Sequence, residues 1–108
     1  MRAIEVYRNG ILAGTLTEVT RQHFVFRYDD GYFNNTAYPP ISLTLPKSQK
    51  EFISEFLFPF FFNMLSEGEN RKLQSTLLRI DTEDNFGLLM ATAQYDTIGA
   101  ITVKPIST

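Results

Sequence analysis

The 108-residue chain contains no cysteine and only one histidine, His23. Without cysteine it has no disulfide framework and no thiolate nucleophile, and it suits a reducing compartment such as the cytoplasm. A single histidine excludes a multi-histidine metal site, and no serine nucleophile stands beside His23 in the sequence. We therefore expect no metal site and no catalytic triad.

Glycine is also sparse, and no two of the six glycines lie closer than four residues apart. Phosphate-binding loops need clustered glycines, because their backbone N–H groups must approach the anion. Neither the Walker A pattern nor G-x-G-x-x-G occurs. We interpret the acidic groups, Asp29-Asp30 and residues 81–84, as a turn and a helix N-terminus rather than as magnesium ligands. The sequence predicts that the chain is not an enzyme by itself and takes no cofactor.

Neither a basic block nor a long hydrophobic run is present. Ten Lys and Arg against twelve Asp and Glu give a net charge of −2, whereas nucleic-acid binding depends on clustered basic residues. The longest apolar run, residues 56–62, is far shorter than the ~20 residues of a membrane helix, and the first residues lack the apolar segment of a secretory signal. We expect a single cytoplasmic domain covering residues 1–108.

Phenylalanine, by contrast, is abundant, with ten residues, six of them between Phe52 and Phe62. Dense phenylalanine is typical of a hydrophobic core, although a local excess also suits a docking surface. We favour the core. Phe24, Phe26 and Tyr28 share one face of a predicted strand and resemble a base-stacking platform. A small nucleic-acid-binding β domain is therefore kept as an alternative.

The first 45 residues alternate between apolar and polar with a period of two, which predicts strands. The dipeptide Asn9-Gly10 predicts a two-residue hairpin turn, and Gly14 predicts a bulge or a close backbone approach. Asp29-Asp30-Gly31 has the composition of a turn. The expected strands cover residues 3–7, 11–18, 23–28 and 41–45, with Ile41, Leu43 and Leu45 on one face of the last.

After Pro46 the period lengthens to nearly four, which predicts helices over residues 55–65, 66–79 and from about 82 onward. Ser66 and Glu69 form a capping-box pattern for the second helix, and Thr82 or Asp81 caps the third. The apolar positions expected to face the core are Leu73, Leu77, Ile80, Phe86, Leu89, Met90 and Ala93. A strand over residues 99–103 closes the chain. The predicted fold class is α+β, a small antiparallel sheet or partly open barrel of about five strands with three helices inserted before the last strand.

Five runs of residues, in the order NGILAGTLTE, HFVFRY, PPISLTLP, FPFFFNMLSEGENR and DNFGLLMATAQYDTIGAITV, resemble the N-terminal subdomain of HipA-like toxin kinases. The resemblance covers residues 4–105. In full-length members this subdomain precedes a larger kinase core that holds the ATP-binding and catalytic residues. Split members encode the subdomain as a separate small protein (HipS) that binds the kinase and can neutralise it as an antitoxin. Because the chain starts at Met1 and stops after the last predicted strand, we expect the stand-alone form.

The resemblance implies a toxin–antitoxin role for a bacterial chain whose partner is a HipA-like Ser/Thr kinase core. Through that complex, a helix-turn-helix DNA-binding antitoxin is a further expected partner. The charged connection after the first predicted helix is the expected contact, or else it is only a helix connector. The partner-binding residues predicted on this basis are Asn63, Ser66, Glu67, Gly68, Glu69 and Arg71. The alternative function is an accessory part of the active toxin that supports kinase folding or substrate choice.

Overall fold

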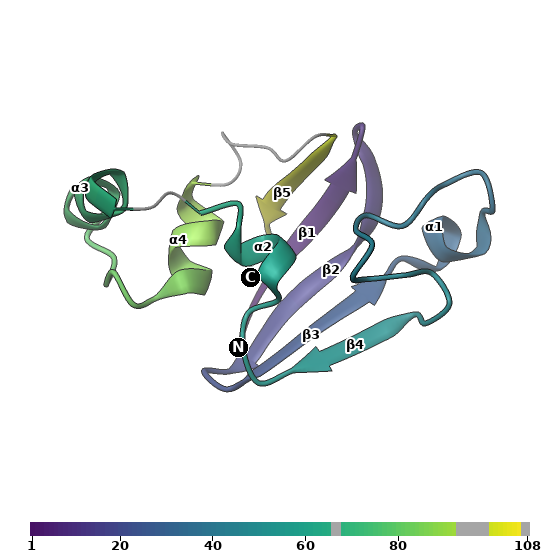
Figure 1. Cartoon of the computed structure of the whole chain (residues 1–108), viewed down its shortest axis with the longest axis horizontal. Helices are drawn as coiled ribbons and strands as arrows, with labels where there is room; N and C mark the ends of the chain where they lie inside the picture. Colours follow the sequence, from purple (N-terminus) through teal and green to yellow (C-terminus); the bar gives the residue numbers. More distant parts are fainter. Residues whose placement is uncertain (66–67, 93–99, 107–108) are drawn as a thin grey trace.

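The computed structural model describes residues 1–65, 68–92 and 100–106. Five strands form one antiparallel sheet with the order β4-β3-β2-β1-β5. The strands are β1 (Arg2–Arg8), β2 (Ile11–Thr20), β3 (His23–Tyr28), β4 (Glu51–Ser54) and β5 (Ile101–Pro105). The helices of the described residues are α1 (Asp30–Asn34), α2 (Pro59–Phe62), α3 (Gly68–Leu78) and α4 (Asn85–Thr92). Figure 1 shows α3 and α4 at one end of the molecule and α1 at the other.

The β1–β2 hairpin follows the turn chemistry of the sequence. Asn9 and Gly10 both have positive φ, 50° and 79°, as a type I′ turn requires. The register shifts between Val6 and Tyr7, next to the pair Val6↔Gly14, so the predicted irregularity at Gly14 is confirmed. A Cβ atom on Gly14 would lie 2.9 Å from Cζ of Phe26 and still closer to the carbonyl oxygen of Arg27. Glycine is therefore the residue that lets β2 and β3 approach here.

One face of the sheet is buried and the other is largely open to solvent, as is common in antiparallel sheets. Phe24, Phe26 and Tyr28 of β3 all lie in the core. The Phe26 ring contacts Phe61 of α2 at a centroid distance of 5.7 Å, and Phe24 lies 6.3 Å from Phe86 of α4. These contacts show that α2 and α4 cover the buried face.

The predicted strand over residues 41–45 is wrong. Residues 41–45 instead form a turn in which Ile41 and Leu45 are buried while Leu43 is 95% exposed. The Tyr28 hydroxyl donates to the Leu45 carbonyl and accepts from the Ile41 N–H at 3.1 Å. The prolines at 40 and 46 lack N–H donors, so this segment is held by a side-chain hydroxyl rather than by a strand ladder. The fourth strand is β4, where Phe52 pairs with Phe26.

The first predicted helix, over residues 55–65, is shorter than expected, and the residues directly before it form a strand. β4 ends at Ser54, and α2 begins only at Pro59, which stands in the first turn where its missing N–H costs little. The turn predicted at Asp29 starts a helix instead. The Asp29 carboxylate accepts from the N–H groups of Gly31 and Tyr32 and so caps α1.

The second and third predicted helices are present as α3 and α4, within two or three residues of the expected ends. α3 is followed by Arg79 with φ of 56°, a left-handed conformation typical of helix ends. Asp84, rather than Thr82 or Asp81, caps α4, because its Oδ1 accepts from the Gly87 N–H at 3.1 Å. Asp81 accepts from the Glu83 N–H in the preceding turn. The Ser66 cap, Ala93 and residue 99, where the last strand was expected to begin, lie outside the described residues. The described part of the last strand is β5, Ile101–Pro105.

Candidate functional site

The described members of the predicted partner-binding group lie around the junction between α2 and α3. Asn63 is exposed at the C-terminal end of α2, and Gly68 is the first residue of α3. Glu69 and Arg71 belong to the first turn of α3, with side chains outside the described part of the structure. Ser66 and Glu67 lie outside the described residues altogether. Asn63 and Gly68, the described ends of this connection, thus lie where α2 ends and α3 begins, and the partner-binding role of the group stays a prediction.

Exposed leucines on α3 form a surface that the sequence pattern assigned to the core. Leu77 is 72% exposed and Leu73 57%, whereas Ser75 between them is buried. The Ser75 hydroxyl donates to the Ile80 carbonyl just beyond the helix. Because α3 turns Ser75 inward, its leucine face points to solvent, and Figure 1 shows the helix at the outer end of the molecule beyond α4. We call Leu73, Leu77 and Leu78 the α3 leucine surface.

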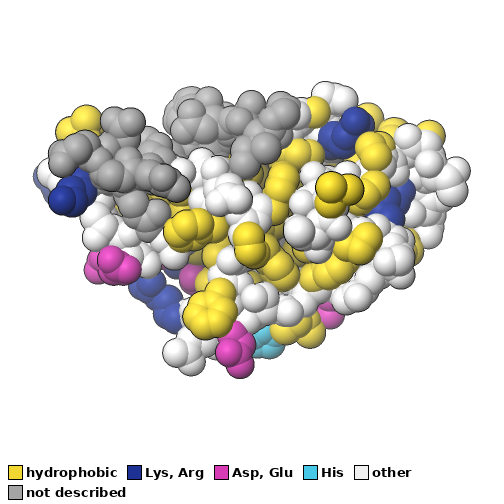
Figure 2. Space-filling model, in the orientation of Figure 1, with side chains coloured by type: hydrophobic (Ala, Val, Ile, Leu, Met, Phe, Trp, Pro, Cys, Tyr) yellow, Lys and Arg dark blue, Asp and Glu magenta, His cyan; other side chains and the backbone are white. Residues whose placement is uncertain are grey.

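A second apolar feature surrounds a hollow of about 230 Å³ between the β2–β3 turn, residues 55–62 and the start of α4. Phe24, Phe56, Phe62 and Phe86 supply its aromatic lining, and Phe56 is 75% exposed. Hydrophobic side chains also gather over the middle of the face seen in Figure 2. The phenylalanine-rich segment therefore contributes to the core through Phe61 and leaves Phe56 exposed at the surface, and the docking role considered from the sequence stays a prediction.

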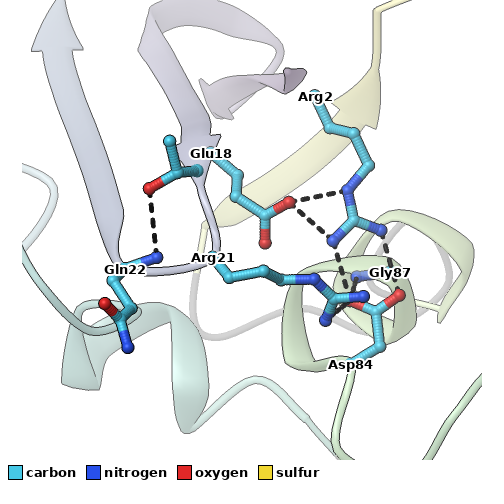
Figure 3. Close-up of polar contacts among 7 residues, drawn as sticks. Arg2, Glu18, Arg21, Gln22, Asp84 and Gly87 are labelled. Atoms are coloured by element: carbon cyan, nitrogen blue, oxygen red, sulfur yellow. Dashed lines mark hydrogen bonds and ion pairs between the residues drawn. The ribbon is translucent and has the colours of Figure 1, made fainter.

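An ion-pair network borders this hollow (Figure 3). Arg2 of β1 donates to Glu18 Oε1 at 2.9 Å and binds both carboxylate oxygens of Asp84, at 2.8 and 3.0 Å. Figure 3 shows Arg21 also pointing toward Asp84, with a nearest distance of 3.5 Å. The hydrogen bonds from Arg2 hold the pKa of Asp84 below its ordinary value and raise the pKa of Arg2. The network thus holds the cap of α4 against the ends of the inner strands β1 and β2.

Gly87 belongs to the same arrangement. A Cβ atom on Gly87 would lie 3.0 Å from Nη1 of Arg2 and closer still to the Asp84 carboxylate. The absence of a side chain at this position leaves room for the bidentate pair. Sequence reasoning missed this network, because its members come from β1, β2 and the start of α4 and share no local pattern.

Within residues 1–65, 68–92 and 100–106, no group of three or more His, Cys, Asp or Glu is arranged to hold a metal ion. No helix in the described part of the chain is long and apolar enough to span a membrane. The rings of Phe24, Phe26 and Tyr28, which resemble a base-stacking platform in the sequence, are buried in the core and cannot stack on bases.

Comparisons with known proteins give matches that cover nearly the whole chain. A solved structure described as the N-terminal domain of HipA toxin superposes with a TM-score of 0.73 and 26% identity, covering 100% of this chain and 95% of that one. An uncharacterized protein of Haemophilus influenzae is 31% identical over 104 residues, which cover 96% of this chain and 92% of that protein.

A longer relative from Sinorhizobium fredii, named "Putative kinase Y4mE", is 26% identical over 105 residues. The match covers 97% of this chain but only 25% of that protein. Residues 4–104 also match the family model described as the HipA N-terminal domain, which confirms the resemblance drawn from the sequence runs. The chain belongs to the HipA N-terminal domain family.

Proposed function

We propose that this chain is a non-catalytic regulatory subunit of a toxin–antitoxin system. It binds a separately encoded HipA-like Ser/Thr kinase core and neutralises it. The observation that carries the proposal is the superposition of the entire chain on the N-terminal domain of HipA toxin. The matched family model is likewise that of the N-terminal domain, from residue 4 to residue 104.

The two sequence relatives support a domain that acts beside a kinase. The Sinorhizobium fredii protein is named a putative kinase, and the matching region makes up one quarter of its length. In the Haemophilus influenzae protein the matching region makes up 92% of the length. The same domain therefore occurs both as part of a much larger chain and as nearly all of a small one. The second arrangement is the one we propose for the regulatory subunit.

The surface supports protein binding. Leu73 and Leu77 are exposed on α3. Burying one leucine side chain in an interface contributes roughly 1.5–3 kcal/mol to the binding free energy, before the cost of fixing side chains and loops is subtracted. Asn63 and the start of α3 adjoin this surface in the chain. We therefore propose that the kinase core contacts the α3 leucine surface together with the segment from Asn63 to Arg71, including Ser66, Glu67, Gly68 and Glu69.

Co-expression with a HipA-like kinase core from the same genome tests the proposal. We expect a complex that survives affinity purification and gel filtration, and growth rescue in cells that express the kinase. Absence of a complex with every encoded HipA-like core would overturn the proposal. Growth arrest only when both proteins are present would instead favour the accessory role in an active toxin.

Two variants locate the contact. The double variant Leu73→Ser, Leu77→Ser is expected to weaken kinase binding by about tenfold or more, because two apolar side chains leave the interface. Leu43→Ser is the matched control, since Leu43 is exposed but lies in the turn next to Tyr28. Equal binding by all three proteins would show that the kinase uses another surface.

A further inference from the structure

We propose that the hollow between the β2–β3 turn, residues 55–62 and the start of α4 receives an arginine or lysine side chain of the partner protein. The identity of that partner rests on the function proposed above, but the ligand chemistry comes from the hollow itself. We call this site the acidic–aromatic hollow. It is lined by aromatic rings and by the carboxylates of Glu18, Glu55, Glu83 and Asp84.

The charge of the hollow favours a cation. Glu18 and Asp84 are bound by Arg2, and Asp84 also faces Arg21. Glu55 and Glu83 have no ion-pair partner among the described residues. Against four carboxylates stand Arg2 and Arg21, so two negative charges remain uncompensated. The Arg21 side chain is 69% exposed and can therefore move aside. An incoming cation would compete with Arg21 for Asp84.

The aromatic lining favours a cation with an apolar stem. The fold already uses this combination beside the hollow, because the Arg2 guanidinium lies 5.3 Å from the centre of the Phe86 ring while it binds Asp84. Phe56, which is 75% exposed, adds an aromatic ring to the solvent side of the hollow. Cation–π contact of an exposed pair contributes about 0.5–1 kcal/mol. Lysine and arginine side chains bury their aliphatic stems while the charged group stays near polar partners.

The size of the hollow favours a single side chain. Its volume of about 230 Å³ is below the roughly 300–1,000 Å³ of pockets that take drug-sized ligands. A charged side chain presented by another protein needs less room than a cofactor or nucleotide. The hollow also opens beside the exposed ring of Phe56, which an approaching protein surface would cover.

The test is an NMR titration of the purified chain with N-acetyl-arginine-N-methylamide, its lysine counterpart and the uncharged norleucine counterpart. We expect amide shifts confined to Arg21, Glu55, Phe56 and Glu83 with both cationic probes and none of comparable size with norleucine. Equal shifts from norleucine, or no shifts at these residues from the cationic probes, would overturn the proposal.

Variants of the lining residues test which side chains bind the probe. Glu55→Gln with Glu83→Gln is expected to weaken arginine binding by about threefold to tenfold, and Phe56→Ala by about threefold. Arg21→Gln is expected to strengthen binding, because it removes the competing cation. Glu51→Gln is the matched control, since Glu51 is an exposed carboxylate that pairs with Arg27 and does not line the hollow. An unchanged affinity in the Glu55, Glu83 double variant would contradict the site.

The titration needs no kinase, so the two proposals can fail separately. If the chain binds the cationic probes but no kinase core, the result supports the proposal for the hollow and contradicts the proposed function. If the wild type and the Glu55, Glu83 double variant bind the kinase with equal affinity and the wild type binds no probe, the result supports the proposed function and contradicts the proposal for the hollow.

Discussion

At Gly14 an added Cβ atom would lie 2.9 Å from Cζ of Phe26 and closer still to the Arg27 carbonyl oxygen. We predict that Gly14→Ala lowers the free energy of unfolding by about 1–3 kcal/mol, because the added methyl group forces the backbone apart. Urea denaturation followed by circular dichroism measures the effect. Gly31→Ala is the control, since its Cβ would meet only the Asp29 carboxylate at 3.3 Å. Similar losses in both variants would contradict the close approach at Gly14.

Asp84 makes stability depend on pH. Its pKa is lowered by hydrogen bonds from Arg2, so its contribution is present above the ordinary aspartate pKa and disappears as the pH falls through the lower pKa of the folded state. We predict that Asp84→Asn lowers the free energy of unfolding by about 1–3 kcal/mol at neutral pH. The difference from wild type should shrink below about pH 4. A difference that stays constant from pH 7 to acid would rule out the carboxylate as its source.

At the scale of elements, the turn over residues 41–45 depends on one hydroxyl from β3. Burial raises the pKa of Tyr28 to about 12, and its hydroxyl joins the Ile41 N–H to the Leu45 carbonyl. We predict that Tyr28→Phe costs about 1–3 kcal/mol, because two buried backbone groups lose their partner while the ring stays in place. Hydrogen exchange at the Ile41 amide should accelerate as well.

Tyr38→Phe is the matched control for the Tyr28 hydroxyl. The Tyr38 ring stacks on Tyr32 at a centroid distance of 5.0 Å, and its hydroxyl has no hydrogen-bond partner among the described residues. We expect this variant to unfold at nearly the wild-type urea concentration. If Tyr28→Phe behaves in the same way, the turn is held by packing and not by the hydroxyl.

For the molecule as a whole, charge and burial argue against nucleic-acid binding. The net charge is −2, and the rings that resembled a stacking platform lie in the core. We predict no binding of a fluorescent single-stranded oligonucleotide in anisotropy measurements at about 50–200 mM salt. Binding at low salt that falls steeply over this range would contradict the prediction and restore that alternative.

Local signals explain the parts of the fold that could be predicted. The hairpin turn follows from the backbone preference of Asn9-Gly10 alone, since both residues adopt positive φ. β1 to β3 show a period of two because one face of each strand is buried. The same period misled at residues 41–45, where Ile41 and Leu45 point inward from a turn. The four-residue spacing of Leu73 and Leu77 predicted the helix correctly but not its exposure, because spacing does not reveal which elements lie nearby.

The candidate site was less predictable than the fold. Asn63 and Gly68 could be placed at a surface connection because they follow a helix end. The acidic–aromatic hollow could not be predicted, because Arg21, Phe56 and Asp84 come from three segments separated by many residues. Only the density of phenylalanine near Phe56 indicated a surface, and from the sequence we preferred to interpret it as core.

The sequence by itself determined the hairpin, the helical spacing that became α3 and α4, and membership in the HipA N-terminal domain family, since these follow from short-range preferences and ordered motifs. Tertiary structure decided that residues 51–54 complete the sheet, that Asp84 caps α4 while bound to Arg2, and that the α3 leucines face solvent. Each of these outcomes depends on contacts between distant residues, whose free energy appears only after the chain has folded.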